Sequence, residues 1–175
     1  MNALIFVVDT VLSLLVYAFL LRLLLQLARA NFRNPLAQAI VELTNWLVRP
    51  LRRVLPPLGR LDTASVAAIL LLQLLATGVT FWLLAGVWSP PGPLLLAALR
   101  QLANAVLQLY TFVVLVYALL SFVAPGTPSP AIHLLGALAE PLLRPVRRLL
   151  PALAGLDLSP LVIIIGLQAL RLLIH

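Results

Sequence analysis

The chain has 175 residues, of which 63% are hydrophobic and only 10% are charged. Soluble domains carry about 25% charged residues, so this composition excludes a water-soluble protein and predicts an integral membrane protein. The formal net charge is +7, and because the arginines that carry it are interleaved with long apolar runs, the expected partners are anionic lipid headgroups and not nucleic acid.

The chain begins with an apolar run that is followed by a polar segment. Residues 4–28 are long enough to cross a bilayer, which takes about 20 apolar residues, and we expect Arg22 to snorkel to the nearby surface. Asn34–Pro35 is typical of a helix start. The helical period after it predicts an amphipathic helix in the membrane interface, broken by Pro50 and Pro56.

The middle of the chain contains two further long apolar runs. Residues 63–88 form the second predicted span, with tryptophans near its end that suit a membrane interface. Residues 89–93 (S-P-P-G-P) predict a tight linker between two halves. Residues 94–124 form the third predicted span, which is longer than a crossing needs and is therefore expected to tilt or protrude.

The last part of the chain repeats the layout of the first. Ser129–Pro130 predicts the start of a second amphipathic helix over residues 132–150, and Ser159–Pro160 starts a last, short span. The predicted fold class is an all-α membrane protein with four transmembrane helices and two interfacial amphipathic helices. The predicted organisation is a first repeat (1–88), a linker (89–93) and a second, parallel repeat (94–175).

One duplicated segment supports this organisation. Arg49 to Asp62 reads R-P-L-R-R-V-L-P-P-L-G-R-L-D, and 95 residues later Arg144 to Asp157 reads R-P-V-R-R-L-L-P-A-L-A-G-L-D. Three arginines, two prolines, three leucines and the final aspartate are identical, which indicates an internal repeat. Each copy precedes an apolar run and is expected to form a basic elbow on the membrane surface. In membrane proteins, loops rich in arginine and lysine lie on the cytoplasmic side. Both elbows are therefore predicted to be cytoplasmic, with the linker and both termini outside.

These motifs resemble the YggT family of bacterial inner-membrane proteins. The resemblance rests on the arginine–proline elbow, the Asn34–Pro35 start, the D-x-S-P of residues 157–160 and the doubled layout, and it covers nearly the whole chain. It implies a multi-pass protein of the bacterial inner membrane. The family is linked to osmotic-stress tolerance and ion uptake, to assembly of membrane complexes and to cell or organelle division, and it has no agreed catalytic residues.

The elbow residues are the first candidate site. Guanidinium groups suit phosphate geometry, so the arginines are expected to bind lipid or a partner, although membrane topology alone also favours them. The acids that follow are expected to cap a helix or to pair with an elbow arginine; a cation site is the alternative, which the positive end of a helix disfavours. The residues are Arg49, Arg52, Arg53 and Asp62 in the first elbow, and Arg144, Arg147, Arg148 and Asp157 in the second.

An intramembrane polar stripe is the second candidate. Polar groups in a bilayer must face protein or a water-filled cavity, so they predict either hydrogen bonds between helices or a polar path. Asp9 and Ser13 in the first span lie four residues apart, as do Asn104 and Gln108 in the third, so each pair shares one helix face. Gln73 and Gln168 lie at matching depth in the second and fourth spans.

Signatures of catalysis and of metal binding are absent from the sequence. There is no nucleophile elbow, zinc-binding helix motif, phosphate-binding glycine loop or cysteine. His133 and His175 fall on opposite predicted sides, so no metal or other cofactor is expected. The favoured function is a non-enzymatic platform that binds anionic lipid and other membrane proteins during assembly or division. The alternative is a small channel or transporter in osmotic tolerance, which would need a homo-oligomer to form a pore.

Overall fold

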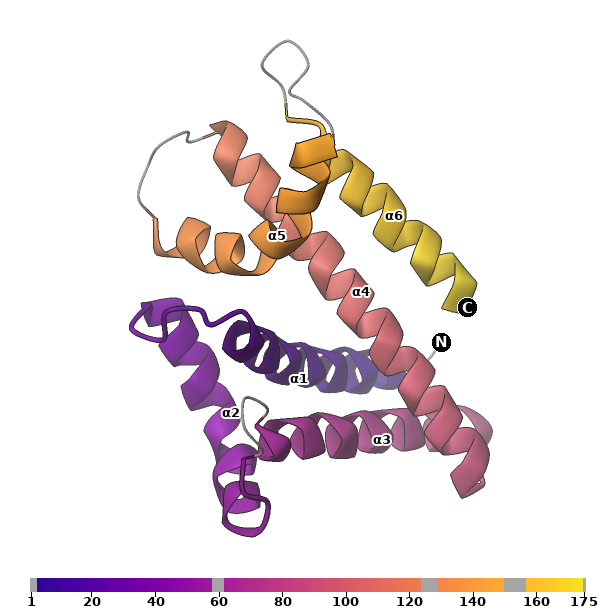
Figure 1. Cartoon of the computed structure of the whole chain (residues 1–175). Coiled ribbons are helices and arrows are strands. Elements are labelled where there is room, and N and C mark those ends of the chain that lie inside the picture. The colour runs from indigo at the N-terminus through magenta and orange to yellow at the C-terminus, as the bar shows by residue number, and fades with distance from the viewer. Residues whose placement is uncertain (1–2, 58–61, 124–128, 150–156, 175) are drawn as a thin grey trace. The chain divides into compact units, whose positions relative to one another are not determined.

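The computed structural model of the chain describes residues 3–57, 62–123, 129–149 and 157–174, and every regular element in these ranges is an α-helix (Figure 1). This confirms the all-α class. The helices are α1 (Ala3–Leu27), α2 (Pro35–Val54), α3 (Thr63–Ala85), α4 (Pro91–Val123), α5 (Pro130–Leu149) and α6 (Ser159–Ile174).

Three of these helices, α1, α3 and α4, are long and apolar enough to cross a membrane. They agree with the first three predicted spans. Helix α6 is apolar but has only 16 residues. At a rise of about 1.5 Å per residue it is roughly 24 Å long, which is shorter than a hydrocarbon core of about 30 Å. The fourth span therefore stays a prediction.

Proline and its neighbours set the helix starts. Pro35 and Pro130 each occupy the first helical position, where a missing N–H group removes no hydrogen bond. Before them, Asn34 Oδ1 accepts from the N–H of residue 36 at 2.9 Å, and Ser129 Oγ accepts from the N–H of residue 131 at 3.3 Å. For the same reason α4 begins at Pro91, three residues earlier than expected, so the second part of the predicted linker is helical.

Proline does not end the amphipathic helices where we expected. Helix α2 continues through Pro50 to Val54, and α5 contains both Pro141 and Pro145. A proline removes one backbone donor and crowds the carbonyl four residues earlier, which bends a helix without having to end it. The ribbon of α5 is visibly bent (Figure 1). The polar elbow arginines thus lie on the last turns of these helices and not in a loop.

The helices fold into two compact units. Unit 1 contains residues 1–23 and 40–105, and unit 2 contains residues 24–39 and 106–175. This spatial division differs from the duplicated halves 1–88 and 94–175, which remain a prediction about the sequence.

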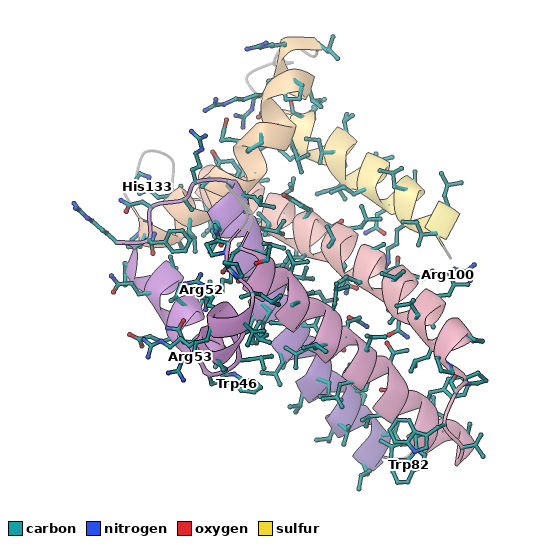
Figure 2. The ribbon with its side chains drawn as sticks, turned by 60° about the horizontal axis from the view of Figure 1, so that its bottom comes forward. Trp46, Arg52, Arg53, Trp82, Arg100 and His133 are labelled. Carbon is teal, nitrogen blue, oxygen red and sulfur yellow. The ribbon has the colours of Figure 1, made fainter. Side chains whose placement is uncertain are left out.

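Unit 1 has its core where α1, α2 and α3 meet. Phe19 is fully buried and packs edge-on against Trp46, with ring centroids 6.2 Å apart. Helices α1 and α3 lie side by side (Figures 1 and 2). Helix α3 ends at Gly86, which has a φ of 71° and donates its N–H to Trp82 O at 2.8 Å. This left-handed cap suits glycine and ends the helix before the predicted boundary at residue 88.

Unit 2 has its core where the second half of α4 meets α5. Val113, Val114, Leu138 and Leu143 are buried there. Gly136 lets the helices approach closely, since an added Cβ atom would lie 3.2 Å from a ring carbon of Tyr117. Outside both cores, many large apolar side chains of the long helices are exposed, as expected for surfaces that face lipid.

Candidate functional site

The first elbow is closed by an ion pair between Arg52 and Asp62. Arg52 donates from Nε to Asp62 Oδ1 at 3.2 Å and from Nη2 to Oδ2, so the pair is bidentate. Ser65 donates its hydroxyl to the same Oδ2 at 2.7 Å. The Asp62 side chain is only 2% exposed. The carboxylate therefore ties the end of α2 to the start of α3, while residues 58–61 lie outside the described ranges.

This pairing replaces one of the two roles expected of Asp62. The residue occupies the N-cap position of α3 but makes no side-chain hydrogen bond to the helix backbone, because its oxygens are engaged by Arg52 and Ser65. Burial acts to raise the pKa of Asp62, yet the hydrogen bonds from these two residues and the charge of Arg52 outweigh it, so the pKa lies below its ordinary value.

The second elbow uses the equivalent residues in a more open form. Arg147 donates from Nε to Asp157 Oδ2 at 2.7 Å and from Nη1 to Glu140 Oε1 at 2.8 Å. Asp157 Oδ1 also accepts from the Ser159 N–H at 2.9 Å, so here the acid both pairs and caps α6. Its side chain is 39% exposed. Residues 150–156, between the two partners, lie outside the described ranges.

The acids of the second elbow are also held in the charged form. Burial acts to raise the pKa of Asp157, but the hydrogen bonds from Ser159 and Arg147 outweigh it and lower the pKa. Burial also acts to raise the pKa of Glu140, but its hydrogen bonds outweigh burial and the pKa is lowered. These bonds come from Arg147, from Arg144 and from the Tyr117 hydroxyl, which donates to Oε1 at 3.0 Å. Two acids and one central guanidinium thus share one network.

The remaining elbow arginines are exposed. Arg49 and Arg53 are exposed on α2, and Arg144 and Arg148 are exposed on α5. Within each pair the residues are four apart, so they share one helix face. Arg49, Arg53 and Arg148 form no ion pair within the described part of the chain, and Arg144 reaches Glu140 only at 3.4 Å. Figure 2 shows Arg52 and Arg53 near the start of α3 and Trp82 towards its other end.

A buried contact that we did not predict lies next to the first elbow. Arg22 does not snorkel; its side chain is buried and donates from Nη1 to Thr44 Oγ1 at 2.7 Å and to Asn45 Oδ1 at 3.0 Å. These acceptors on α2 hold Arg22 against the neighbouring helix inside unit 1. The repeat offset of 95 relates Arg22 to Tyr117 and Asn45 to Glu140, so both halves join their helices by a donor and an acceptor at matching positions.

Two members of the predicted polar stripe, Gln73 and Asp9, take part in separate hydrogen-bonded groups. Gln73 is buried and donates to Gln101 Oε1 at 2.9 Å, and Thr77 donates to the same oxygen at 2.8 Å. Asp9 is exposed and accepts from Thr80 at 3.1 Å. Of the other predicted members, Ser13 and Asn104 are partly buried, and Gln108 and Gln168 are exposed. Gln101, Thr77 and Thr80 were missed, although Thr77 follows Gln73 by one helical turn.

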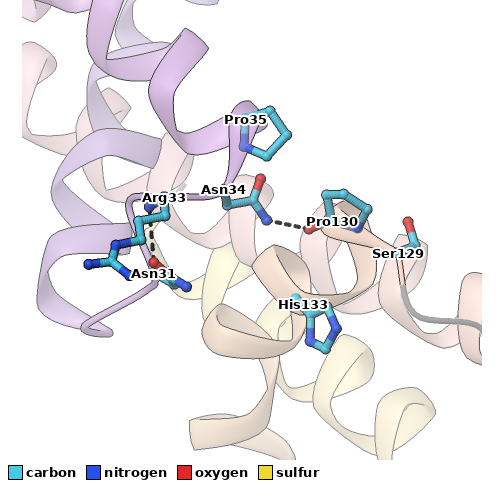
Figure 3. Close-up of a pocket in the computed structure, with 7 residues that line it drawn as sticks. All are labelled: Asn31, Arg33, Asn34, Pro35, Ser129, Pro130 and His133. Carbon is cyan, nitrogen blue, oxygen red and sulfur yellow. Dashed lines mark hydrogen bonds between the residues drawn. The ribbon is translucent and has the colours of Figure 1, made fainter.

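The starts of α2 and α5 meet in unit 2 and line a cavity of about 520 Å³ (Figure 3). Asn34 Nδ2 donates to Pro130 O at 2.6 Å across this junction. Arg33 and His133 are the titratable residues that line it. In the described ranges, no group of three or more histidine, cysteine or acidic residues could hold a metal ion, and His175 lies outside those ranges.

Comparison with known proteins identifies the family. The sequence description of the CCB3/YggT family matches residues 1–83 and 96–175. The chain belongs to the CCB3/YggT family. The resemblance inferred from the elbow motifs is thereby confirmed.

Relatives of this YggT-family chain cover nearly its full length. It is 37% identical over 175 residues to the uncharacterized protein YggT of Escherichia coli strain K12, covering 98% of this chain and 89% of the relative. It is 39% identical over 174 residues to an uncharacterized protein of Pseudomonas aeruginosa, covering 99% and 88%. An uncharacterized protein of Vibrio alginolyticus is 39% identical over 169 residues, covering 96% and 91%. No solved structure matches.

Proposed function

We propose that this protein is a non-enzymatic platform of the bacterial inner membrane. Its elbows bind anionic lipid on the cytoplasmic side, and its surface engages other membrane proteins during assembly or division. Helix α6 serves as the fourth span, both termini lie outside, and the amphipathic helices α2 and α5 lie in the interface. The observation that carries the proposal is that one arginine in each elbow pairs with the acid at the start of the next helix, whereas the other two arginines are exposed and do not contact that acid.

The exposed arginines supply the lipid attraction. Each basic residue near an anionic leaflet contributes about 1 kcal/mol, so Arg49, Arg53, Arg144 and Arg148 together contribute on the order of 4 kcal/mol. Because these side chains are exposed, the attraction weakens as salt is raised. The polar side chains of the long helices do not favour the alternative function, a conducting path. Gln73, Thr77 and Gln101 form hydrogen bonds with one another, as expected of polar residues that hold membrane helices together.

The test is a lipid-binding measurement on the full chain in mild detergent. The variant with Arg49, Arg53, Arg144 and Arg148 all changed to Gln should bind phosphatidylglycerol at least about tenfold more weakly than wild type, since it loses several kcal/mol of attraction. Native mass spectrometry counts the bound lipids, and circular dichroism checks that the helices are intact.

A matched control separates local binding from net charge. Changing Arg29, Arg33, Arg100 and Arg171 to Gln removes the same charge outside the elbows. This control should keep most of its phosphatidylglycerol binding. Equal binding by wild type and the elbow variant, or equal losses in the elbow variant and the control, would reject elbow-specific lipid binding.

A further inference from the structure

We propose that a cavity beside the second elbow binds the headgroup of an ethanolamine phospholipid. The chemical class is a primary ammonium joined to a phosphodiester. The proposal rests on the membrane location given under Proposed function, but it concerns a different lipid and different residues from the exposed arginines.

The cavity lies inside unit 2 and has a volume of about 230 Å³. Its wall combines groups of opposite charge with hydroxyl and apolar groups. Its lining includes Tyr117, Ser121 and Phe122 of α4, Arg147 of α5, and Asp157 and Pro160 at the start of α6.

The acid of the second elbow is more accessible than that of the first, and the two halves differ in sequence beside it. At the position of Pro160, the first half has Ser65, whose hydroxyl donates to Asp62 Oδ2 at 2.7 Å and is fully buried. Proline has no such donor. The side chain of Asp157 is 39% exposed, against 2% for Asp62. The two elbows therefore share their ion pair but differ in whether the acid can meet a ligand.

The charges of the wall select a ligand with both signs. A phosphate alone would approach Arg147 but would be repelled by the carboxylate of Asp157 and by that of Glu140, which also pairs with Arg147. A simple cation would face the opposite conflict. A zwitterionic headgroup can place its phosphodiester oxygens near the guanidinium and its ammonium near the carboxylate, so that both contacts are favourable.

The two charged groups retain hydrogen-bonding capacity. A guanidinium has five N–H donors, and the described bonds of Arg147 use Nε and Nη1, which leaves Nη2 for phosphate. A carboxylate accepts about four hydrogen bonds, and Asp157 receives two, from Arg147 and Ser159. An ethanolamine ammonium has three N–H donors that can use the remaining capacity, whereas the quaternary ammonium of choline has none.

Size and surroundings favour a lipid over a free metabolite. One water occupies about 30 Å³, so a cavity of about 230 Å³ holds a headgroup but not the acyl chains. Phe122 and Pro160 give the wall apolar groups, and the neighbouring side chains of Leu161 and Val162 on α6 are exposed. Acyl chains that leave the cavity can therefore lie against an apolar helix surface.

The experiment compares three lipids with identical acyl chains, titrated into the full chain in mild detergent and counted by native mass spectrometry. Wild type should bind phosphatidylethanolamine about tenfold more tightly than phosphatidylcholine, because choline leaves the carboxylate without a hydrogen-bond donor. Asp157→Asn should remove this preference. Arg148→Gln should weaken phosphatidylglycerol binding and leave the preference intact.

A second variant covers the case in which Asp157→Asn fails to fold. Ser121→Leu fills the cavity and keeps both charges, and it should also abolish the preference. Glycerophosphoethanolamine, which lacks acyl chains, should compete only at concentrations about a hundredfold above those of the lipid, and competition at equal concentration would overturn the assignment to a lipid.

The outcomes separate the two proposals. Equal wild-type binding of phosphatidylethanolamine and phosphatidylcholine would reject the cavity assignment, and so would a preference that survives in Ser121→Leu. Either result leaves phosphatidylglycerol binding by the exposed arginines standing. Conversely, unchanged phosphatidylglycerol binding in the elbow variant, with a preference that depends on Asp157, would reject the anionic-lipid proposal alone.

Discussion

Replacing Asp62 by Asn tests whether the ion pair of the first elbow stabilises the fold. The change keeps the shape of the side chain but removes the charge that Arg52 faces. Breaking a buried ion pair costs about 3–5 kcal/mol, and an exposed pair is worth about 0–1 kcal/mol. The Asp62 side chain is 2% exposed but that of Arg52 is 46% exposed, so the guanidinium can regain water. We therefore expect a loss of about 2–3 kcal/mol in the free energy of unfolding.

The second elbow supplies the matched comparison. In Asp157→Asn the partners are 37% and 39% exposed, so the expected loss is about 1 kcal/mol or less. At roughly 2–4 °C per kcal/mol for a chain of this size, Asp62→Asn should lower the Tm by about 4–12 °C and Asp157→Asn by at most about 4 °C.

Thermal unfolding in mild detergent, followed by circular dichroism, measures both variants on the same scale. A double-mutant cycle with Arg52→Gln then isolates the pair, and its coupling energy should be about 2 kcal/mol. Equal Tm shifts at the two elbows would refute the reasoning from burial. A coupling energy near zero would show that Asp62 acts without Arg52.

Two further predictions use the same unfolding measurement. The pKa of Asp62 in the folded state lies below its ordinary value of 3.8, so the ion pair stabilises the protein above that value and loses this contribution as pH falls through the folded pKa. The Tm difference between wild type and Asp62→Asn should thus be constant above about pH 5 and shrink below about pH 4; a difference that persists in acid would contradict the shift. Gly166→Ala in α6 meets no atom within 4 Å and should stabilise by up to about 1 kcal/mol, whereas Gly136→Ala places a methyl group 3.2 Å from the Tyr117 ring and should gain nothing. Equal gains would show that this ring yields easily.

The helix starts were predictable because their signals are local. Asn34–Pro35, Ser129–Pro130 and Ser159–Pro160 each combine a polar capping residue with a proline whose missing N–H is harmless at that position, and the structure begins α2, α5 and α6 within one residue of each expected start. The helix ends were less predictable. Pro50 was expected to break α2, but whether a proline bends or ends a helix depends on the packing around it, which the local sequence does not contain.

The candidate site was predictable only in part for a related reason. The repeat identified the arginines and the acid of each elbow, yet it did not indicate which arginine meets the acid. The pairing depends on how the last turn of α2 faces the start of α3. This orientation brings Arg52, and not Arg49 or Arg53, to Asp62. Arg22 was missed because its partners are about 20 residues away on another helix. The repeat could have indicated this contact, because Tyr117 and Glu140 occupy the positions of Arg22 and Asn45 in the second half and are likewise a donor and an acceptor.

The two elbows have the same arginine–aspartate pair but differ in how far the aspartate is exposed. Closure needs only the arginine–aspartate pair, which both halves retain. The residues around the pair are then free to differ: Ser65 in the first half completes the shell of a buried acid, and Pro160 in the second leaves the acid at a cavity wall. Placing a serine at position 160 should therefore reduce the exposure of Asp157 and weaken phosphatidylethanolamine binding. A Pro160→Ser variant that binds this lipid as tightly as wild type would show that the missing hydroxyl is not what opens the second elbow.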